Sequence, residues 1–294
     1  MTAGSSKTRR NTTEVKFGAL FLGALFAAGA ALAQEPKITE ETPYVQSPAV
    51  VVETMLEMAG VRATDFVIDL GSGDGRIVIA AAKRYGARGF GVDYDPRLVR
   101  LAGENARAAG VSGQVTFYEQ DIFATDLGAA SVITMYLLPE YNLALKPRLL
   151  ALRPGTRIVS HDWGMGDWPA DAEKTVPVPD KPVGLRKSST IYQWMVPASV
   201  EGRWRSSLPP GGWSGGRDVV LQLAQHYQLV SGTARIGARN FPIGRASLRG
   251  DLLSFHVFDG RRTLRFKGQV SGGRIAGRLS IGARSFRWRA LRIE

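Results

Sequence analysis

The chain has 294 residues, no cysteine, three histidines and a formal net charge of +12 at pH 7. The absence of cysteine excludes disulfide bonds, thiolate metal sites and a cysteine nucleophile, and three histidines argue against a histidine-rich metal site. The charge is unevenly distributed along the chain. Residues 201–294 hold 17 Lys and Arg against 5 Asp and Glu, whereas residues 1–200 hold 21 basic and 21 acidic side chains and are neutral overall. We therefore expect two domains, a neutral one followed by a strongly basic one.

The N-terminus combines a positive segment with an apolar one. Four Lys and Arg side chains within residues 7–16 precede an unbroken run of Phe, Leu, Ala and Gly over residues 17–32. Ala31-Leu32-Ala33 fits a small-x-small cleavage site. The run is shorter than the roughly 20 residues of a spanning helix. Residues 1–33 are therefore expected to be a signal peptide or, if uncut, a membrane anchor, with the protein exported to the periplasm or anchored in the inner membrane.

The stretch after Phe66 predicts a strand, a tight turn and a helix. An apolar run reaches Asp69 and Leu70, glycines alternate at Gly71, Gly73 and Gly75, and a helix-compatible run follows. Glycine allows a sharp turn and leaves room for a ligand to lie against the backbone. The stretch therefore predicts a ligand-binding turn at the end of a strand.

A second short strand, residues 88–92, ends at Asp93. An acid about 20 residues after a glycine-rich turn is placed to accept hydrogen bonds from a ribose. The glycine spacing is G-x-G-x-G rather than the dinucleotide spacing G-x-G-x-x-G, and carboxylates at Asp69 and Asp74 would repel a pyrophosphate. These features favour a nucleoside cofactor with a cationic end.

The pattern D-L-G-S-G-D-G resembles the first motif of the S-adenosylmethionine-dependent methyltransferases of the Rossmann-like, seven-strand class. The resemblance implies S-adenosylmethionine as cofactor, with Asp69, Gly71, Gly73, Asp74 and Asp93 among its contacts. In that superfamily an acid after the third strand commonly meets the adenine amine, which here implies Asp121.

Further strands and helices follow in alternation. Strands are expected at residues 115–118, 131–136, 157–160 and 188–196, with helices at 96–109 and 141–152. Alternation of this kind predicts an α/β fold, a doubly wound and mostly parallel sheet with helices on both faces. Ligands bind such sheets at the carboxyl ends of the strands.

A narrower resemblance rests on Thr42-Pro43-Tyr44-Val45-Gln46-Ser47-Pro48, on Val50-Val51-Val52-Glu53-Thr54-Met55-Leu56 and on the glycine motif. Over residues 42–170 the chain is similar to the protein-lysine methyltransferases of ATP synthase subunit c and the adenine nucleotide translocase, with their bacterial relatives. The resemblance implies a protein substrate with a lysine amine as methyl acceptor. A small-molecule or lipid acceptor, or an exported binding protein with a vestigial cofactor fold, stays open.

Five side chains are candidates for binding the cofactor or for catalysis beside it. Tyr44 is expected to close over its amino-acid end, while Tyr136, Glu140, His161 and Asp162 follow the fourth and fifth strands and are candidate catalytic residues. An amine acceptor must arrive neutral, which burial or a nearby base can arrange. Each candidate catalytic residue could instead have a structural role. Tyr136 could be a core aromatic, Glu140 an acid at a helix N-terminus, and His161 and Asp162 could stabilise a turn.

Past Pro197 the pattern changes to short alternating runs separated by glycine-containing turns. Runs at residues 219–223, 227–230, 252–257, 263–266, 274–281 and 286–293 predict a small antiparallel barrel. The domains are accordingly expected at 34–197 and 198–294. Arg287 and Arg289 are expected on the outer side of the last run. This outer side could be a plain solvated surface, or it could bind an anionic membrane or envelope polymer, or an acidic protein partner. Nucleic acid is disfavoured by the export signal.

Overall fold

The computed structural model describes Met1 and residues 44–181, 186–210 and 217–293. The predicted signal peptide or anchor at residues 1–33 lies outside this part of the chain, apart from Met1. Among the helices described, none is both long and apolar enough to cross a bilayer.

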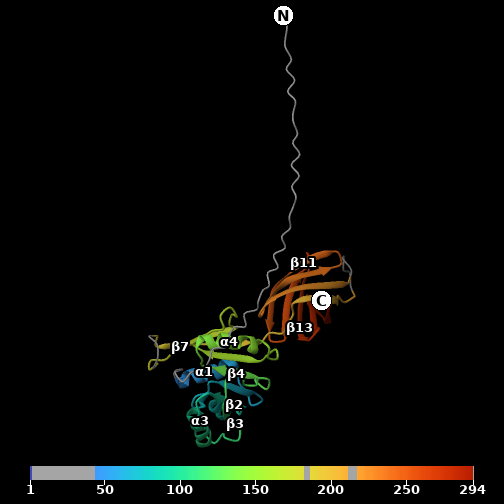
Figure 1. Ribbon diagram of the computed structural model, residues 1–294. Helices are drawn as coiled ribbons and strands as arrows, with labels where there is room; N and C mark the ends of the chain where they lie inside the picture. The colour runs from blue at the N-terminus through green and yellow to red at the C-terminus, as the bar shows by residue number, and fades with distance from the viewer. Residues whose placement is uncertain (2–43, 182–185, 211–216, 294) are drawn as a thin grey trace, which may run out of the picture. The chain divides into compact units, whose positions relative to one another are not determined.

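The first region is a seven-stranded sheet with helices between its strands. In chain order its elements are α1 (Ala49–Ala59), β1 (Phe66–Leu70), α2 (Arg76–Tyr85), β2 (Arg88–Asp93), α3 (Pro96–Ala108), β3 (Val115–Glu119), β4 (Val132–Met135), α4 (Pro139–Leu150), β5 (Arg157–His161), β6 (Ala172–Pro177) and β7 (Ser188–Met195). The strand order is β3-β2-β1-β4-β5-β7-β6, with β7 antiparallel to β5 and β6 (Figure 1). The predicted Rossmann-like, mostly parallel sheet is confirmed.

The central strands bury both of their faces. On β1, Val67 joins the core formed with α1 and α2, while Ile68 joins the core formed with α4. Val132 and Ile133 on β4 divide in the same way. Burial on both faces explains why these strands are continuous apolar runs rather than alternating ones. The order of the strands reverses beside β1, so the crevice for a ligand is expected at the carboxyl ends of β1, β2 and β4.

Two elements of this region were not predicted. α1 starts after Pro48 and ends at Gly60, whose φ of 57° is left-handed, as is common after a helix. β6 covers residues 172–177, lies at the edge of the sheet and ends on Pro177. An edge strand can accommodate this proline because its missing N–H costs no ladder bond on the open side.

The second region is a closed antiparallel barrel, which confirms the fold predicted for the basic part of the chain (Figure 1). Its strands are β8 (Gly202–Ser207), β9 (Asp218–His226), β10 (Leu229–Ile236), β11 (Arg239–Arg249), β12 (Leu252–Phe258), β13 (Thr263–Ser271), β14 (Arg274–Ile281) and β15 (Arg284–Arg292). The prediction missed β8 and β11. Trp204, Phe255, Phe266 and Trp288 are fully buried and fill the interior. The domain boundary at residues 197/198 stays a prediction.

Candidate active site

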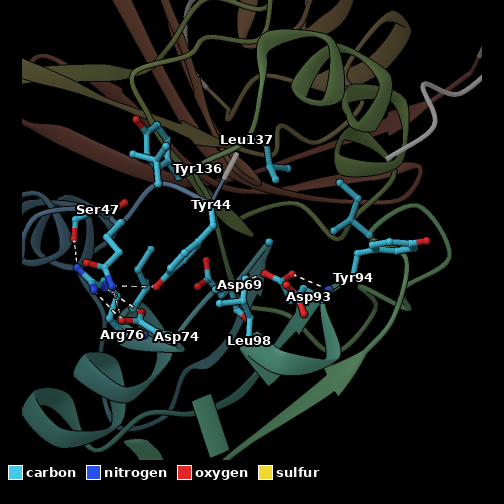
Figure 2. A pocket seen from close by; sticks show the side chains of 18 of the residues that line it. Tyr44, Ser47, Asp69, Asp74, Arg76, Asp93, Tyr94, Leu98, Tyr136 and Leu137 are labelled. Carbon is cyan, nitrogen blue, oxygen red and sulfur yellow. Dashed lines mark hydrogen bonds and ion pairs between the residues drawn. The ribbon is translucent and has the colours of Figure 1, made fainter. Parts of the chain in front are cut away.

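A cavity of about 730 Å³ lies at the carboxyl ends of β1, β2 and β4 (Figure 2). Six of the seven predicted cofactor residues line it: Tyr44, Asp69, Gly71, Gly73, Asp74 and Asp93. Of the four predicted catalytic residues, Tyr136 lines it. The sheet topology thus gathers side chains from three strands and from the segment before α1 around one space.

The glycine turn is built for close approach. Gly71 and Gly73 have left-handed φ angles of 73° and 53°. A Cβ added at Gly71 would lie 2.7 Å from Leu137 Cδ2, and one at Gly73 would lie 2.5 Å from the Tyr44 ring. Only glycine fits at these positions without displacing its neighbours, so the turn forms a floor that Tyr44 and Leu137 cover directly.

Asp69 is a buried carboxyl group with an incomplete set of partners. Its side chain is 1% exposed, and its Oδ1 accepts a hydrogen bond of 2.7 Å from Thr134. Within the described residues, its Oδ2 has no hydrogen-bond partner. Burial, with smaller contributions from Asp93 and Asp74, raises the pKa of Asp69 to about 8. A cationic ligand group placed here would both complete the hydrogen bonding and favour the ionised form.

Asp93 is held rigidly at the end of β2. Its Oδ2 accepts the N–H of Gly73 at 2.7 Å, and its Oδ1 accepts the N–H of Asp95 at 3.0 Å. A carboxylate oxygen has a second lone pair, so each oxygen can also accept from a ligand hydroxyl. The two fixed oxygens suit the vicinal hydroxyls of a ribose.

Asp74 takes part in a network that joins the glycine turn to the segment before α1. Arg76 donates to both of its carboxylate oxygens, at 2.9 and 2.6 Å, and also to the backbone oxygen of Ser47 at 2.8 Å. Gln46 donates to the Tyr44 hydroxyl and to Asp74. Burial alone would raise the pKa of Asp74, but the guanidinium of Arg76 keeps it below its usual value. In Figure 2 the Tyr44 ring lies between this ion pair and Asp69.

His161 connects the same segment to the far part of the sheet. Its Nδ1 lies 2.9 Å from the Ser47 hydroxyl, and its Nε2 lies 2.8 Å from the Ser189 hydroxyl on β7. Its ring stacks on Tyr136 with centroids 3.8 Å apart. Burial lowers the pKa of His161 to about 4 against the opposing effect of Asp162, so the imidazole is neutral at pH 7. A neutral imidazole accepts through one nitrogen and donates through the other, which matches two hydroxyl partners.

Four predicted site residues lie outside the lining of the cavity: Asp121, Glu140, His161 and Asp162. Asp121 accepts from the N–H of Phe123, and the next residue, Ile122, lines the cavity instead. Glu140 stands in the first turn of α4. Asp162 accepts from Lys181 at 2.6 Å and from the N–H of Thr190.

Four residues of the site had no role predicted from the sequence: Gln46, Ser47, Arg76 and Ser189. Gln46 and Ser47 stand inside the quoted segment 42–48, and Arg76 directly follows the glycine motif, so their position was visible. Their partners were not, because the hydrogen bond between Ser47 and His161 joins residues 114 positions apart.

These features define the class of protein. An orphaned buried carboxylate oxygen for an ammonium, two fixed oxygens for a ribose and a floor that excludes a Cβ fit S-adenosylmethionine. The chain is an S-adenosylmethionine-dependent methyltransferase of the Rossmann-like class.

Comparison with known proteins agrees. Residues 69–172 match the model of the ANTKMT methyltransferase domain. A protein-lysine N-methyltransferase of Saccharolobus islandicus is 38% identical over 52% of this chain and 93% of its own length. The mouse adenine nucleotide translocase lysine N-methyltransferase is 35% identical over 44% of this chain, which spans about half (56%) of that relative. The chain belongs to the methyltransferase family that includes these protein-lysine methyltransferases.

A solved structure is also similar. The structure of a Salinibacter ruber protein, described as an RNA methyltransferase in complex with S-adenosyl-L-homocysteine, is 46% identical and covers 53% of this chain and 96% of its own, with a TM-score of 0.48.

Proposed function

We propose that this protein transfers the methyl group of S-adenosylmethionine to the side-chain amine of a lysine in another protein. The similarity to the Saccharolobus islandicus protein-lysine methyltransferase supports this acceptor. The observation in the structure that carries it is the aromatic lining of the cavity, to which Tyr44 and Tyr136 both contribute.

Cofactor binding falls to three groups of this chain. Asp69 would hold the ammonium, Asp93 the ribose hydroxyls, and the backbone at Gly71 and Gly73 would lie against the cofactor. The cofactor supplies a methyl group on a sulfonium, which is an activated leaving group. The work left to the protein is therefore to hold the acceptor nitrogen in line and to exclude water.

Tyr136 and its neighbours suit an amine acceptor. The Tyr136 ring is stacked on an imidazole that is neutral at pH 7, so the imidazole itself adds no positive charge that would oppose an approaching lysine. A lysine ammonium is attracted to the face of an aromatic ring. Desolvation then favours its neutral form, which is the form that attacks. His161 touches Tyr136 rather than the cavity, so its part in this scheme is to position that ring and Ser47.

The test is transfer of radiolabelled methyl into the protein, RNA and lipid fractions of cells by purified residues 34–294. We expect label on a protein, with mass spectrometry placing it on lysine. Asp93→Ala should weaken cofactor binding by about ten- to a hundredfold, the cost of losing a charged hydrogen-bonding group, while Asp126→Ala in an exposed turn should not. Tyr136→Ala should reduce transfer without weakening S-adenosylhomocysteine binding.

Label confined to the RNA or lipid fraction would refute the lysine acceptor and leave the methyltransferase in place. Label that persists in Asp93→Ala would refute the assignment of the cofactor contacts.

We further propose that the protein works outside the cytosol or at the inner membrane. The basic and apolar pattern of residues 7–33 supports this address. Fusion of a reporter that is active only after export, to the full chain and to residues 34–294, tests it. Equal reporter activity in the two fusions would refute it.

A further inference from the structure

The outer surface of β13, β14 and β15, which we call the basic face, presents one sign of charge. Six cationic side chains alternate with buried ones along these strands and are exposed: Arg265, Lys267, Arg274, Arg278, Arg287 and Arg289. No aspartate or glutamate occurs from residue 260 to residue 293. The basic face therefore has no acid of its own strands to neutralise it.

The strand register places three of these cations in direct line. Lys267 pairs with Arg278, and Arg278 pairs with Arg287. Side chains directly opposite on neighbouring antiparallel strands have Cβ atoms about 5 Å apart, and like charges there are destabilising. Within the part of the chain that the structure describes, no carboxylate forms an ion pair with any of the three. An anionic partner would relieve this repulsion.

An exposed leucine lies among the arginines. Leu291 is 55% exposed, and its neighbours across the ladder are Arg274 on β14 and Arg205 on β8. Arg289 precedes it on the same side of β15. An aliphatic tip surrounded by guanidinium groups matches the boundary between lipid headgroups and acyl chains, where apolar side chains enter and cations meet anionic headgroups.

The same face lacks what a single-stranded nucleic acid would use. Bases stack on aromatic side chains, but Phe266 and Trp288 point into the barrel and are each 2% exposed. The outward positions of β13–β15 carry no aromatic residue. The apolar run at residues 17–32, expected to be a signal peptide or an anchor, also favours a partner at a membrane over a nucleic acid.

We propose that the basic face docks on a bilayer of anionic phospholipid, with Lys267, Arg278 and Arg287 on the headgroups and Leu291 entering the interface. This surface is separate from the methyl-transfer cavity, so it holds whatever the acceptor is.

Vesicle co-sedimentation tests the proposal, with the full chain and with residues 34–294, which contain every described helix and strand. Vesicles of equal parts phosphatidylglycerol and phosphatidylcholine are compared with phosphatidylcholine alone. We expect binding to the anionic vesicles that weakens as salt is added. R278Q/R287Q in residues 34–294 should bind about thirtyfold more weakly, because each cation near an anionic surface contributes about a factor of five.

The matched control is R235Q/R239Q, which removes the same charge from β10 and β11. It should weaken binding by less than about threefold, because these two cations lie outside the basic face and the attraction to an anionic surface falls off with distance. Leu291→Ser should weaken binding without changing its salt dependence. Equal losses in the two double variants would show a net-charge effect and overturn the proposal. So would tighter binding to duplex DNA or to an acidic protein than to anionic vesicles, or no binding to the vesicles at all.

Discussion

The α/β region and the barrel differ in how they treat buried polar groups. Three buried side-chain atoms lack a hydrogen-bond partner among the described residues, namely Asp69 Oδ2, Ser72 Oγ and Asn142 Oδ1, and all lie in the α/β region. In the barrel, the indole N–H of Trp204 donates to the Val200 oxygen, and that of Trp288 donates to Ser206. A region that binds a ligand can leave buried polar atoms without a partner in the protein, because the ligand supplies one. A region whose interior only packs forms hydrogen bonds for its buried polar groups within the protein.

The two regions also differ in the sign and place of their charged groups. The α/β region holds carboxylates inside its cavity, where Asp69 and Asp93 are part of the lining. Among its described residues, the barrel has no buried carboxylate, and it presents cations on its outer surface. One region therefore acts through its interior and the other through its surface, and four substitutions test this contrast.

The largest expected effect is on the barrel interior. Trp288→Ala should lower the free energy of unfolding by about 3–5 kcal/mol, the usual cost of truncating a buried tryptophan. Its ring packs against Phe255 and Phe266, with centroids 5.9 and 5.1 Å away. Urea unfolding followed by circular dichroism measures it, and Arg287→Ala on the outer face of the same strand is the control. A loss below about 1 kcal/mol would show that the interior tolerates a cavity.

The next effect concerns His161 and pH. Its pKa in the folded protein is about 4, below the ordinary 6.5, so between these pH values the unfolded chain binds more protons. The free energy of unfolding should therefore fall as the pH falls from 6.5 to 4, by on the order of 3 kcal/mol.

His161→Gln keeps hydrogen-bonding groups for Ser47 and Ser189 but cannot titrate. Its melting temperature should depend less on pH between 6.5 and 4 than that of the unmodified protein, with Asp162 and Lys181 left in place in both. Identical pH profiles would mean that other groups set acid stability.

Asp69 should show opposite effects on stability and binding. Its folded pKa of about 8 lies above 3.8, so the stability it contributes is complete at low pH and is lost as the pH rises through 8. Asp69→Asn should therefore raise the melting temperature at pH 8. It should also weaken S-adenosylhomocysteine binding by on the order of 2 kcal/mol, since a hydrogen bond to a charged group is lost.

Calorimetry and thermal denaturation measure the two effects on the same samples. Asp126→Asn, in an exposed turn where its carboxylate accepts from Gly128, is the control and should change neither. A variant that binds normally would show that the orphaned oxygen of Asp69 is not the cofactor's contact.

The parts of the site that sequence could predict are those with local chemistry. Asp69, Gly71, Gly73 and Asp93 follow from a turn and two strand ends, and the fold places all four at one cavity. The two hydrogen bonds of the His161 ring could not be predicted, because Ser47, His161 and Ser189 come from three distant segments of the chain. Nothing in the sequence near His161 indicates which hydroxyls it meets.

The fold shows the same division. Alternation predicted most barrel strands, but β11 was missed because Pro242 and Gly244 interrupt its pattern and its register shifts between Gly244 and Ser247. In α1, Val50-Val51-Val52 favours a strand locally. Tertiary packing decides otherwise, since Val51 and Val52 are buried in the core beside the sheet.

The smallest expected effect is on the basic face itself. Arg278 stands between Lys267 and Arg287, so Arg278→Gln should raise the free energy of unfolding by about 0.5 kcal/mol at low salt, as like charges across strands oppose folding. The gain should disappear in about 1 M salt, where charges are screened within about 3 Å. Arg235→Gln is the control, because Arg235 lies opposite Asn240 and Val220 and has no cation to repel. Equal gains from both substitutions would mean that overall charge rather than the register opposes folding. A gain confined to Arg278 would show that like charges across the strands cost stability at the barrel surface, as burial of a carboxyl group does at Asp69 in the cavity.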